Sequence, residues 1–161
     1  MKLWRIIKES NLENAFSGEG AKAFGGRWNH EGTTVVYCSN SLALAAMELF
    51  IHVQRPDKFR PLKSIKLFSI EIRVPLSVSN EEVKYDTIPE AWMEMPAADE
   101  TKNIGSDWAR ECRSLLLKVP ALVVPSGDNY LINPLHKEFK KLKFSKPKEF
   151  IFDKRLWRAV G

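Results

Sequence analysis

The run from Leu42 to Val53 constrains the fold more than any other stretch, because it is apolar nearly all round and Glu48 is its only charge before the end. A helix that is apolar on all sides is expected to be central to a fold rather than to lie on its surface. Asn40 or Ser41 is a suitable N-cap for its first turn. A lone carboxylate on such a helix is costly unless it is paired or hydrogen-bonded. Glu48 is therefore the first candidate functional residue.

An arginine that follows two glycines precedes this helix. The glycines at positions 25 and 26 let the backbone adopt unusual dihedral angles or approach a ligand closely. Arg27 can hold a phosphate through two parallel hydrogen bonds. The β-branched residues at 33–37 predict a strand between the arginine and the helix. Strand, turn and helix can thus gather Arg27, Tyr37 and Glu48 in one cleft.

These side chains suit the cleavage of an N-glycosidic bond in a nucleotide. Trp28 or Tyr37 can stack on a base or on a nicotinamide-like ring. A buried carboxylate at Glu48 can stabilise an oxocarbenium-like centre or position the group that attacks it. From spacing alone two simpler interpretations stay open, namely a structural ion pair between Arg27 and Glu48 and an ordinary core position for Tyr37.

The cysteines, the histidines and the length of the apolar runs indicate which classes of protein this chain can belong to. The three His and two Cys stand at no spacing typical of metal ligands, so we expect no metal site. Two isolated thiols in a chain of 161 residues suit a reducing cytoplasm. Charge interrupts the N-terminus too early for a signal sequence, and no run of about 18 apolar residues is present. The sequence therefore predicts a cytoplasmic protein that does not enter a membrane.

Positive charge is concentrated late in the chain, which has a net charge of +5. The basic residues there are Lys137, Lys140, Lys141, Lys143, Lys146, Lys148, Lys154, Arg155 and Arg158. Such a surface can bind nucleic acid, an acidic protein or a phosphate-bearing small molecule, or it can be a solvated rim. It lacks the interleaved aromatic platform of an RNA binder, so we expect no direct contact with nucleic acid.

Periodicity and turn residues predict one domain without repeats or linkers. Strands are expected at residues 4–7, 33–37, 64–74, 115–119, 121–124 and 130–132, with a final strand pair within 144–152. Helices are expected at 42–53, near 90–95, at 104–113 with Ser106 or Asp107 as N-cap, and at 135–141. Residues 8–24 are expected as a loop with one helical turn near 12–16, and residues 55–63 as a loop. The long excursion at 75–103 is typical of a lid or a partner surface.

Motifs along almost the whole chain resemble, in order, those of the RES domain. They are Gly25-Gly26-Arg27-Trp28-Asn29 with Gly32, Val35-Val36-Tyr37 with Ser39, Ala43-Leu44-Ala45 with Glu48, Ile104-Gly105 with Trp108, Asn129-Tyr130-Leu131-Ile132-Asn133-Pro134 with His136, and Phe152-Asp153 with Arg155. RES proteins are toxins of bacterial toxin–antitoxin pairs, partnered by Xre-type helix-turn-helix antitoxins, and they consume NAD⁺. The resemblance implies an α+β fold over residues 1–161, a single ADP-ribosyltransferase-like domain with a split, mostly antiparallel β core and flanking helices.

The family is named for an Arg, a Glu and a Ser, and the first two match Arg27 and Glu48. Tyr37 matches a further active-site position. The Ser belongs to a Val-Pro-Ser run upstream of the Asn-Pro, at a position that falls on Ala121 in this chain. A Val-Pro-Ser run does occur five residues later and ends at Ser126. Either Ser126 takes the catalytic role through a shifted turn, or Ala121 replaces the Ser.

The resemblance also implies roles around NAD⁺, which is the substrate, without a metal. Arg27 is expected to grip the pyrophosphate or ribose side, and Trp28 and Tyr37 to pack on the nicotinamide end. Glu48 is expected to steady the ribosyl cation as nicotinamide leaves. Further NAD⁺-binding residues are Ser39, Asn133 and His136. The acceptor of ADP-ribose stays open between water, phosphate and a protein side chain.

Two other functions stay open at this point. One is a nucleic-acid-directed toxin that uses the basic C-terminal third, and the other is a catalytically weakened member that only binds its antitoxin. Ala121, in place of the family Ser, gives a reason to consider the second. The oligomeric state is open too, with the apolar loop around Trp92 and Met95 as a candidate homodimer interface.

Overall fold

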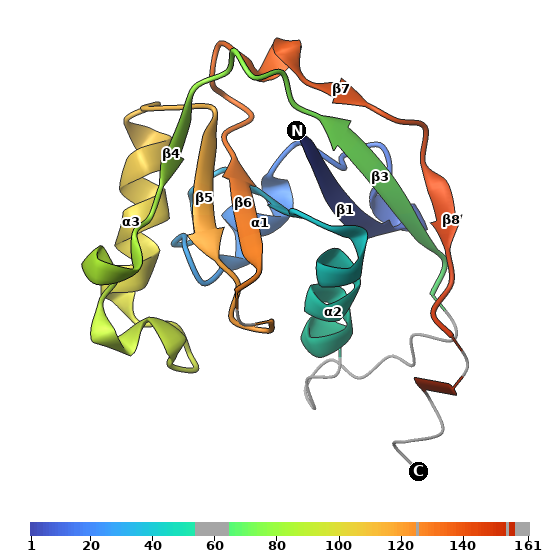
Figure 1. Ribbon diagram of the computed structural model, residues 1–161, viewed down its shortest axis with the longest axis horizontal. Coiled ribbons are helices and arrows are strands. Elements are labelled where there is room, and N and C mark those ends of the chain that lie inside the picture. Colours follow the sequence, from blue (N-terminus) through green and yellow to red (C-terminus); the bar gives the residue numbers. More distant parts are fainter. Residues whose placement is uncertain (54–64, 125, 154, 157–161) are drawn as a thin grey trace.

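The computed structural model describes residues 1–53, 65–124, 126–153 and 155–156. The eight strands within these ranges form one sheet in the order β4-β5-β6-β2-β1-β3-β7, with β8 also paired to β3 (Figure 1). Neighbouring strands are antiparallel except for β4 and β5. The structure confirms an α+β fold with a mostly antiparallel core.

The described strands and helices have the following bounds. The strands are β1 (Lys2–Lys8), β2 (Val36–Ser39), β3 (Leu67–Arg73), β4 (Asn80–Glu82), β5 (Leu116–Pro120), β6 (Asp128–Ile132), β7 (Lys143–Phe144) and β8 (Lys148–Phe150). The α-helices are α1 (Glu19–Phe24), α2 (Leu42–Val53) and α3 (Asp99–Arg110). Short 3₁₀ turns are η1 (Glu9–Asn11), η4 (Tyr85–Thr87), η5 (Glu90–Met93) and η6 (Phe139–Lys141).

Alternation along the strands sends apolar side chains to both faces of the sheet. On β2, Cys38 joins the cluster that contains Leu3 and Ile132. The neighbouring Tyr37 packs instead against the cluster that contains Trp28 and Trp108. Hydrophobic side chains therefore cover both faces of the sheet, and Tyr37 lies on the face beneath α3.

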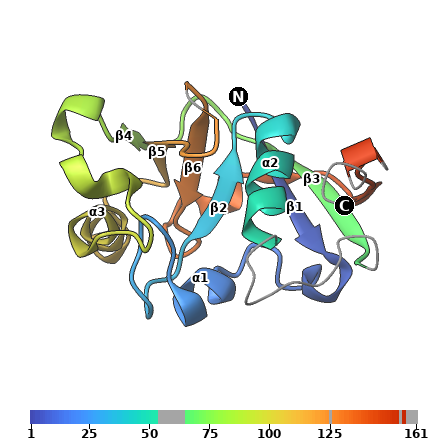
Figure 2. The same cartoon turned by 90° about the horizontal axis from the view of Figure 1, so that it is seen from below.

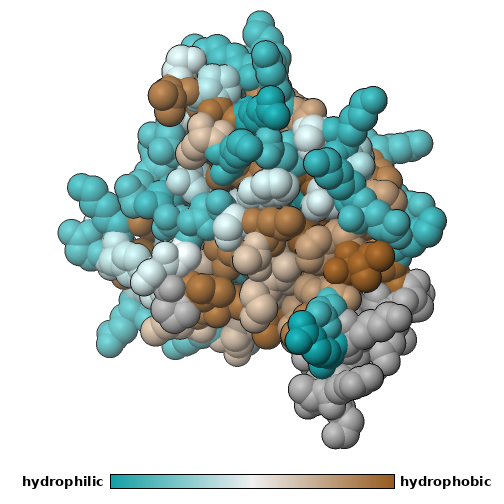
Figure 3. Space-filling model, turned by 45° about the vertical axis from the view of Figure 1, so that its right-hand side comes forward, coloured by the Kyte–Doolittle hydropathy of each residue, from teal (hydrophilic) through white to brown (hydrophobic). Residues whose placement is uncertain are grey.

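Helix α2 packs across β1 and β2 (Figure 2). Its bounds are as expected, but the expectation that it is central is wrong. Leu44 and Ala45 are buried against the sheet, whereas Met47 and Ile51 are 42% and 49% exposed. The helix belongs to a single layer over the sheet, so only one of its sides can be buried. Figure 3, turned toward this side of the molecule, shows the resulting band of apolar surface.

Two helices differ from the expectation. Helix α3 begins at Asp99 rather than near residue 104, because Asp99 and Glu100 give it an acidic first turn that suits the helix dipole. Ser106 is consequently buried within the helix and not its N-cap. Helix α1 lies in a stretch expected as a loop, and positive φ angles at Gly18 (76°) and Gly25 (63°) let the chain enter and leave it.

The strand expected at 121–124 is absent from the described structure, and the chain bends there instead. Pro120 ends the β5–β6 ladder opposite Asp128. The Ala121 amide then donates to the Gly127 carbonyl oxygen at 3.0 Å. This bond closes a loop between β5 and β6, so the apolar run that follows Pro120 cannot extend the strand.

The other expected strands coincide with β1, β2, β3, β5 and β6 with shifted ends, and the final pair with β7 and β8. The expected helices near 90–95 and 135–141 reduce to the 3₁₀ turns η5 and η6. The loop expected at 55–63 lies outside the described residues. Among the helices that the structure describes, none combines the length and apolarity that a membrane crossing requires.

Candidate active site

The loop that carries Arg27 is built around a close approach of Tyr37. A Cβ atom on Gly26 would lie only 2.5 Å from the Tyr37 hydroxyl oxygen, so no larger residue fits without displacing the loop or the ring. The Tyr37 hydroxyl donates to Asn29 Oδ1 at 2.7 Å and accepts from the Trp28 amide at 3.1 Å. Glycine at position 26 is thus required by sterics, because β2 and the loop meet there.

Asn29 fixes the loop from within. It is fully buried, and its Nδ2 donates to the carbonyl oxygens of Ala21 at 3.0 Å and of His30 at 2.9 Å.

Burial raises the pKa of the Tyr37 phenol well above its ordinary value, against the smaller opposing effect of the Trp28 amide hydrogen bond. Tyr37 is therefore a neutral phenol whose hydroxyl anchors the arginine loop.

Arg5 supports Tyr37 from the neighbouring strand. The sequence places this cation between large apolar residues, where it needs a polar partner. Its Nη1 donates to the Tyr37 carbonyl oxygen at 2.6 Å. Backbone and hydroxyl of Tyr37 are thus both held, the first by β1 and the second by the arginine loop.

The guanidinium of Arg27 is oriented by η5 and the two residues that follow it. Nη1 donates to the carbonyl oxygens of Trp92 at 2.5 Å and of Glu94 at 3.1 Å. Nη2 lies 2.7 Å from Met95 Sδ. The long excursion between β3 and α3 therefore supplies one wall around Arg27.

Glu48 projects from α2 and is held by a neighbouring strand. Its Oε1 accepts a hydrogen bond of 2.6 Å from Asn129 Nδ2 on β6. Asn129 Oδ1 in turn accepts a bond of 2.7 Å from Ser39 Oγ on β2. Burial raises the pKa of Glu48 above its ordinary value, while the Asn129 hydrogen bond and the charge of Arg27 act in the opposite direction.

Arg27, Tyr37 and Glu48 lie close enough to interact electrostatically. The charge of Arg27 acts on both Glu48 and Tyr37, so the three side chains share one electrostatic environment. Within the described part of the chain, Arg27 and Glu48 are not joined by an ion pair. The alternative of a structural ion pair is therefore not supported. A cation and a carboxylate that face the same region without neutralising each other can serve a ligand that carries both charges.

Trp28 has a different place from the one expected. It is 2% exposed in the core beneath α3, and it stacks on Trp92 with ring centroids 6.0 Å apart. A ring buried in this way has no face left for nicotinamide, so the expected NAD⁺ contact of its side chain is wrong. Trp92 itself is only partly buried, and the neighbouring Met93 and Met95 are exposed, so the homodimer interface expected around this loop stays a prediction.

Asn133 and His136 lie beyond the other end of β6 and take part in turns. Asn133 is fully buried, and its Nδ2 donates to the Ala109 carbonyl oxygen at 2.9 Å, near the end of α3. His136 Nδ1 accepts from the Glu138 amide at 3.2 Å. Both side chains thus take part in the turn that follows β6, and their contact with NAD⁺ stays a prediction.

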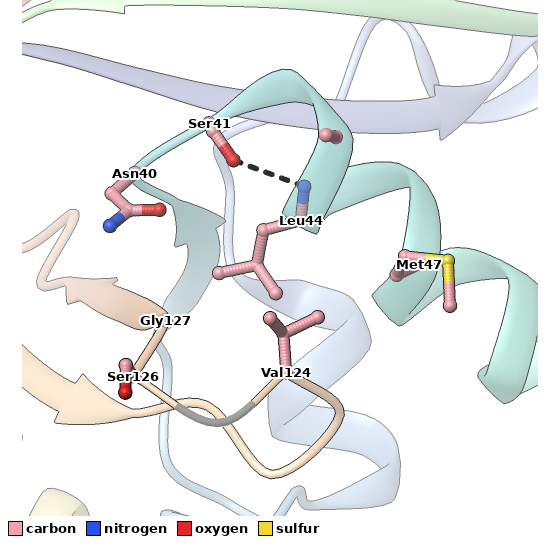
Figure 4. Close-up of a pocket in the computed structure, with 8 residues that line it drawn as sticks. Asn40, Ser41, Leu44, Met47, Val124, Ser126 and Gly127 are labelled. Atoms are coloured by element: carbon pink, nitrogen blue, oxygen red, sulfur yellow. Dashed lines mark hydrogen bonds between the residues drawn. The ribbon is translucent and has the colours of Figure 1, made fainter.

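The two candidates for the family Ser both lie in the β5–β6 loop. Ser126 is exposed at a turn with φ of 65°, and it lines a groove of about 440 Å³ with Leu44, Met47 and Val124 (Figure 4). Ala121 is 3% exposed at the base of the same loop. Ser126 thus shares the groove with Leu44, which lies one helical turn before Glu48 on α2. The described hydrogen bonds include none between Ser126 and Glu48.

Sequence reasoning missed Asn129 as a site residue, although it opens the Asn-Tyr-Leu-Ile-Asn-Pro motif. Its importance depends on the pairing of β6 with β2, which sets Asn129 opposite Ser39. Among the described residues, no group of three His, Cys, Asp or Glu side chains is arranged to hold a metal ion. The arrangement offers a cation, a carboxylate and amide groups, which suit charge stabilisation.

Comparison with known proteins shows which family and fold this chain resembles. A family model described as the RES domain matches residues 2–153. "Toxin Res" of Yersinia enterocolitica is 36% identical over 97% of this chain and 99% of its own. "Prs ADP-ribosylating toxin" of Sphingobium sp. is 37% identical over 98% of this chain and 97% of its own. A chain of the M. tuberculosis MbcT–MbcA toxin–antitoxin complex shares the fold, with a TM-score of 0.73 at 16% identity over 99% of this chain and 87% of that one.

Proposed function

The chain belongs to the RES domain family, and from this membership we propose that it is the toxin of a bacterial toxin–antitoxin pair that consumes NAD⁺. The observation that carries the proposal is Glu48, a half-buried carboxylate held by Asn129 within the electrostatic influence of Arg27. The names of the relatives from Yersinia and Sphingobium support the toxin activity, and the second supports NAD⁺ chemistry.

The reaction is cleavage of the bond between the nicotinamide nitrogen and C1′ of the ribose. Arg27 binds the pyrophosphate or the ribose side, because a guanidinium pairs well with phosphate oxygens. As the bond breaks, its electron pair moves to the nicotinamide ring and positive charge develops on the ribose. The carboxylate of Glu48 stabilises that charge in the transition state. Tyr37 acts through the loop that it anchors.

The acceptor that adds to C1′ defines the class of enzyme. With water the protein is an NAD⁺ glycohydrolase, with phosphate a phosphorylase, and with a protein side chain an ADP-ribosyltransferase. The Sphingobium relative is named for ADP-ribosylation, which supports the last class for that relative. Purified protein incubated with NAD⁺, with and without phosphate and with a cell extract, distinguishes the three acceptors by mass spectrometry of the products.

Release of nicotinamide tests the proposal itself. We expect Glu48→Gln to lower the rate by at least about a hundred-fold, because it removes the charge that stabilises the transition state. Glu149→Gln, at an exposed position of β8, is the matched control and keeps full activity. A folded wild-type protein that releases no nicotinamide under any acceptor condition would refute the proposal.

The proposed partner is an Xre-type helix-turn-helix antitoxin. The similarity to a toxin chain of a toxin–antitoxin complex is compatible with such a partner, and we expect the antitoxin to cover the region near Arg27 and block NAD⁺. Toxicity on expression supplies the test. Growth arrest that is relieved by Arg27→Ala and by co-expression of a helix-turn-helix protein encoded beside this gene supports the assignment, and arrest that persists in both cases contradicts it.

The basic surface does not favour a nucleic-acid-directed activity. Its described lysines on β7 and β8 lie along the edge of the sheet beyond β3, whereas Arg27 lies toward α3 and η5. The two regions are separated by β1 and β2 in the strand order. We therefore assign this surface no part in the reaction.

A further inference from the structure

Asn129 connects Ser39 on β2 to Glu48 on α2. Its Nδ2 donates to Glu48 Oε1 at 2.6 Å, and its Oδ1 accepts from Ser39 Oγ at 2.7 Å. The first bond is short, as is typical when the acceptor is ionised. Ser39 is 4% exposed, so its hydroxyl is shielded from the solvent that competes for hydrogen bonds.

The two bonds together fix the orientation of the amide. An asparagine presents one accepting oxygen and one donating nitrogen, and an ionised carboxylate can only accept. The carboxylate of Glu48 therefore takes the nitrogen of Asn129, and the amide oxygen on the other side accepts from the Ser39 hydroxyl, which holds the amide in place. A flipped amide would point its oxygen at the carboxylate and repel it. The observed orientation therefore favours the ionised form of Glu48 over the protonated form.

The backbone holds Asn129 in place independently of these side chains. In the sheet it lies opposite Ser39 on one side and Val119 on the other, so β6 is clamped between β2 and β5. An amide on a central strand cannot swing away as a loop residue can. Within the described residues Asn129 is the one hydrogen-bond donor to Glu48, which leaves Oε2 for a ligand.

The groups that face Glu48 act on its charge in different directions. Burial against the sheet disfavours the ionised carboxylate, and Asn129 from β6 and Arg27 from the loop favour it. The neutral phenol of Tyr37 faces it from β2. On α2 itself, His52 follows one turn later. Asn129 is thus the group in direct contact that opposes the effect of burial.

We propose that Asn129, held by Ser39, is the positioning residue that keeps the Glu48 carboxylate charged and aimed at the reacting centre. The inference rests on the proposed NAD⁺ cleavage for its role in catalysis, whereas the effect on Glu48 is a property of the protein without substrate. Ser39 therefore acts through Asn129 rather than by touching NAD⁺. The Ser39–Asn129 pair thus supplies Glu48 with a hydrogen bond that is itself anchored by a hydroxyl.

Asn129→Leu is the principal test, because it removes the amide while keeping the size of the side chain. The titration of Glu48 is followed by NMR of ¹³C-labelled carboxyl groups, assigned with Glu48→Gln, and nicotinamide release is measured across pH. We expect Asn129→Leu to move the Glu48 titration and the acidic limb of kcat/KM to higher pH. At neutral pH we expect about a ten-fold loss of activity, which shrinks as the pH rises.

Two further variants complete the test. Ser39→Ala keeps the amide but removes its anchor, so we expect a smaller shift in the same direction. Asn80→Ala, at an exposed position of β4, is the control and moves neither curve. An unmoved Glu48 titration in folded Asn129→Leu and Ser39→Ala proteins overturns the inference, whatever the activity. A wild-type protein without NAD⁺ cleavage refutes the proposed function, and the Glu48 titration alone then decides the inference.

Discussion

At the scale of single residues, Gly26 sets the distance between the arginine loop and β2. The space where its side chain would lie is taken by the Tyr37 hydroxyl and by Asn29 Oδ1, at 2.5 Å and 2.9 Å from an ideal Cβ. The hydrogen bond between these two groups closes the loop. The position of Arg27 therefore depends on glycine, which has no side chain, at the preceding residue.

We expect Gly26→Ala to destabilise the protein by about 1–3 kcal/mol, because the added methyl group overpacks this contact. It should also lower nicotinamide release, since the loop that carries Arg27 must shift. Gly20→Ala is the matched control, because a Cβ there meets nothing within 4 Å and lies in helix α1. We expect that change to be neutral or to stabilise the protein by up to about 1 kcal/mol. Urea unfolding of both variants measures the difference, and equal stabilities would contradict the steric argument.

The same scale shows what local sequence can and cannot predict. Arg27, Tyr37 and Glu48 belong to one loop, strand and helix in succession, so their spacing could suggest that they lie near one another. Asn129 could not be found in this way, because its place depends on the register between β6 and β2. Trp28 looked like a ligand-stacking ring, yet the packing of α3 over the sheet buries it.

At the scale of elements, Glu138 ties the turn η6 to the start of β4 and β5. Its carboxylate accepts bonds from Lys141 Nζ at 2.6 Å and from the amide of Ser79 at 2.9 Å. The Ser79 hydroxyl accepts in turn from the Leu115 amide at 2.9 Å. Lys141 first, and then Ser79, lower the pKa of Glu138 from its ordinary 4.5 to about 2. The connection thus depends on an ionised carboxylate.

The direction of this pKa shift predicts a pH dependence. A lowered pKa in the folded state means that ionised Glu138 stabilises the fold above pH 4.5, and that this contribution is lost as the pH falls toward about 2. We expect Glu138→Gln to lower the unfolding temperature near neutral pH and to make little difference near pH 2. Glu149→Gln serves as the exposed control. A Glu138→Gln effect of constant size across this range would contradict the role of the charge.

Elements were predicted well where the pattern is local and less well where packing decides. The apolar run and the cap residues were enough to predict the bounds of α2. They did not predict that one side of the helix is exposed to solvent, because an apolar sequence does not indicate how many layers of structure cover it. The apolar residues 121–124 read as a strand, yet the Ala121–Gly127 hydrogen bond turns them into a loop. In both cases the deciding partner lies elsewhere in the sequence.

At the scale of the whole molecule, charge is divided unevenly. After residue 135 the chain has nine Lys and Arg but only three Asp and Glu. Before it there are sixteen Lys and Arg and seventeen Asp and Glu, so the last part carries the entire positive excess. We expect any association with nucleic acid to come from this excess and to disappear at about 0.2 M salt, because counterion release drives such binding. Gel shifts over a salt series measure it. Binding that persists at high salt would point to specific recognition instead.

The position of β6 has a consequence for protein synthesis. This strand enters the sheet between β5 and β2, and it brings Asn129 to Glu48 late in the chain. A nascent chain on the ribosome that has not yet exposed residues 128–132 has Arg27, Tyr37 and Glu48 but lacks the strand that joins the two halves of the sheet. Such long-range pairing also makes folding slow relative to helical proteins. On the proposed function, premature termination before Asp128 should therefore yield harmless fragments, because β6 and its Asn129 are missing.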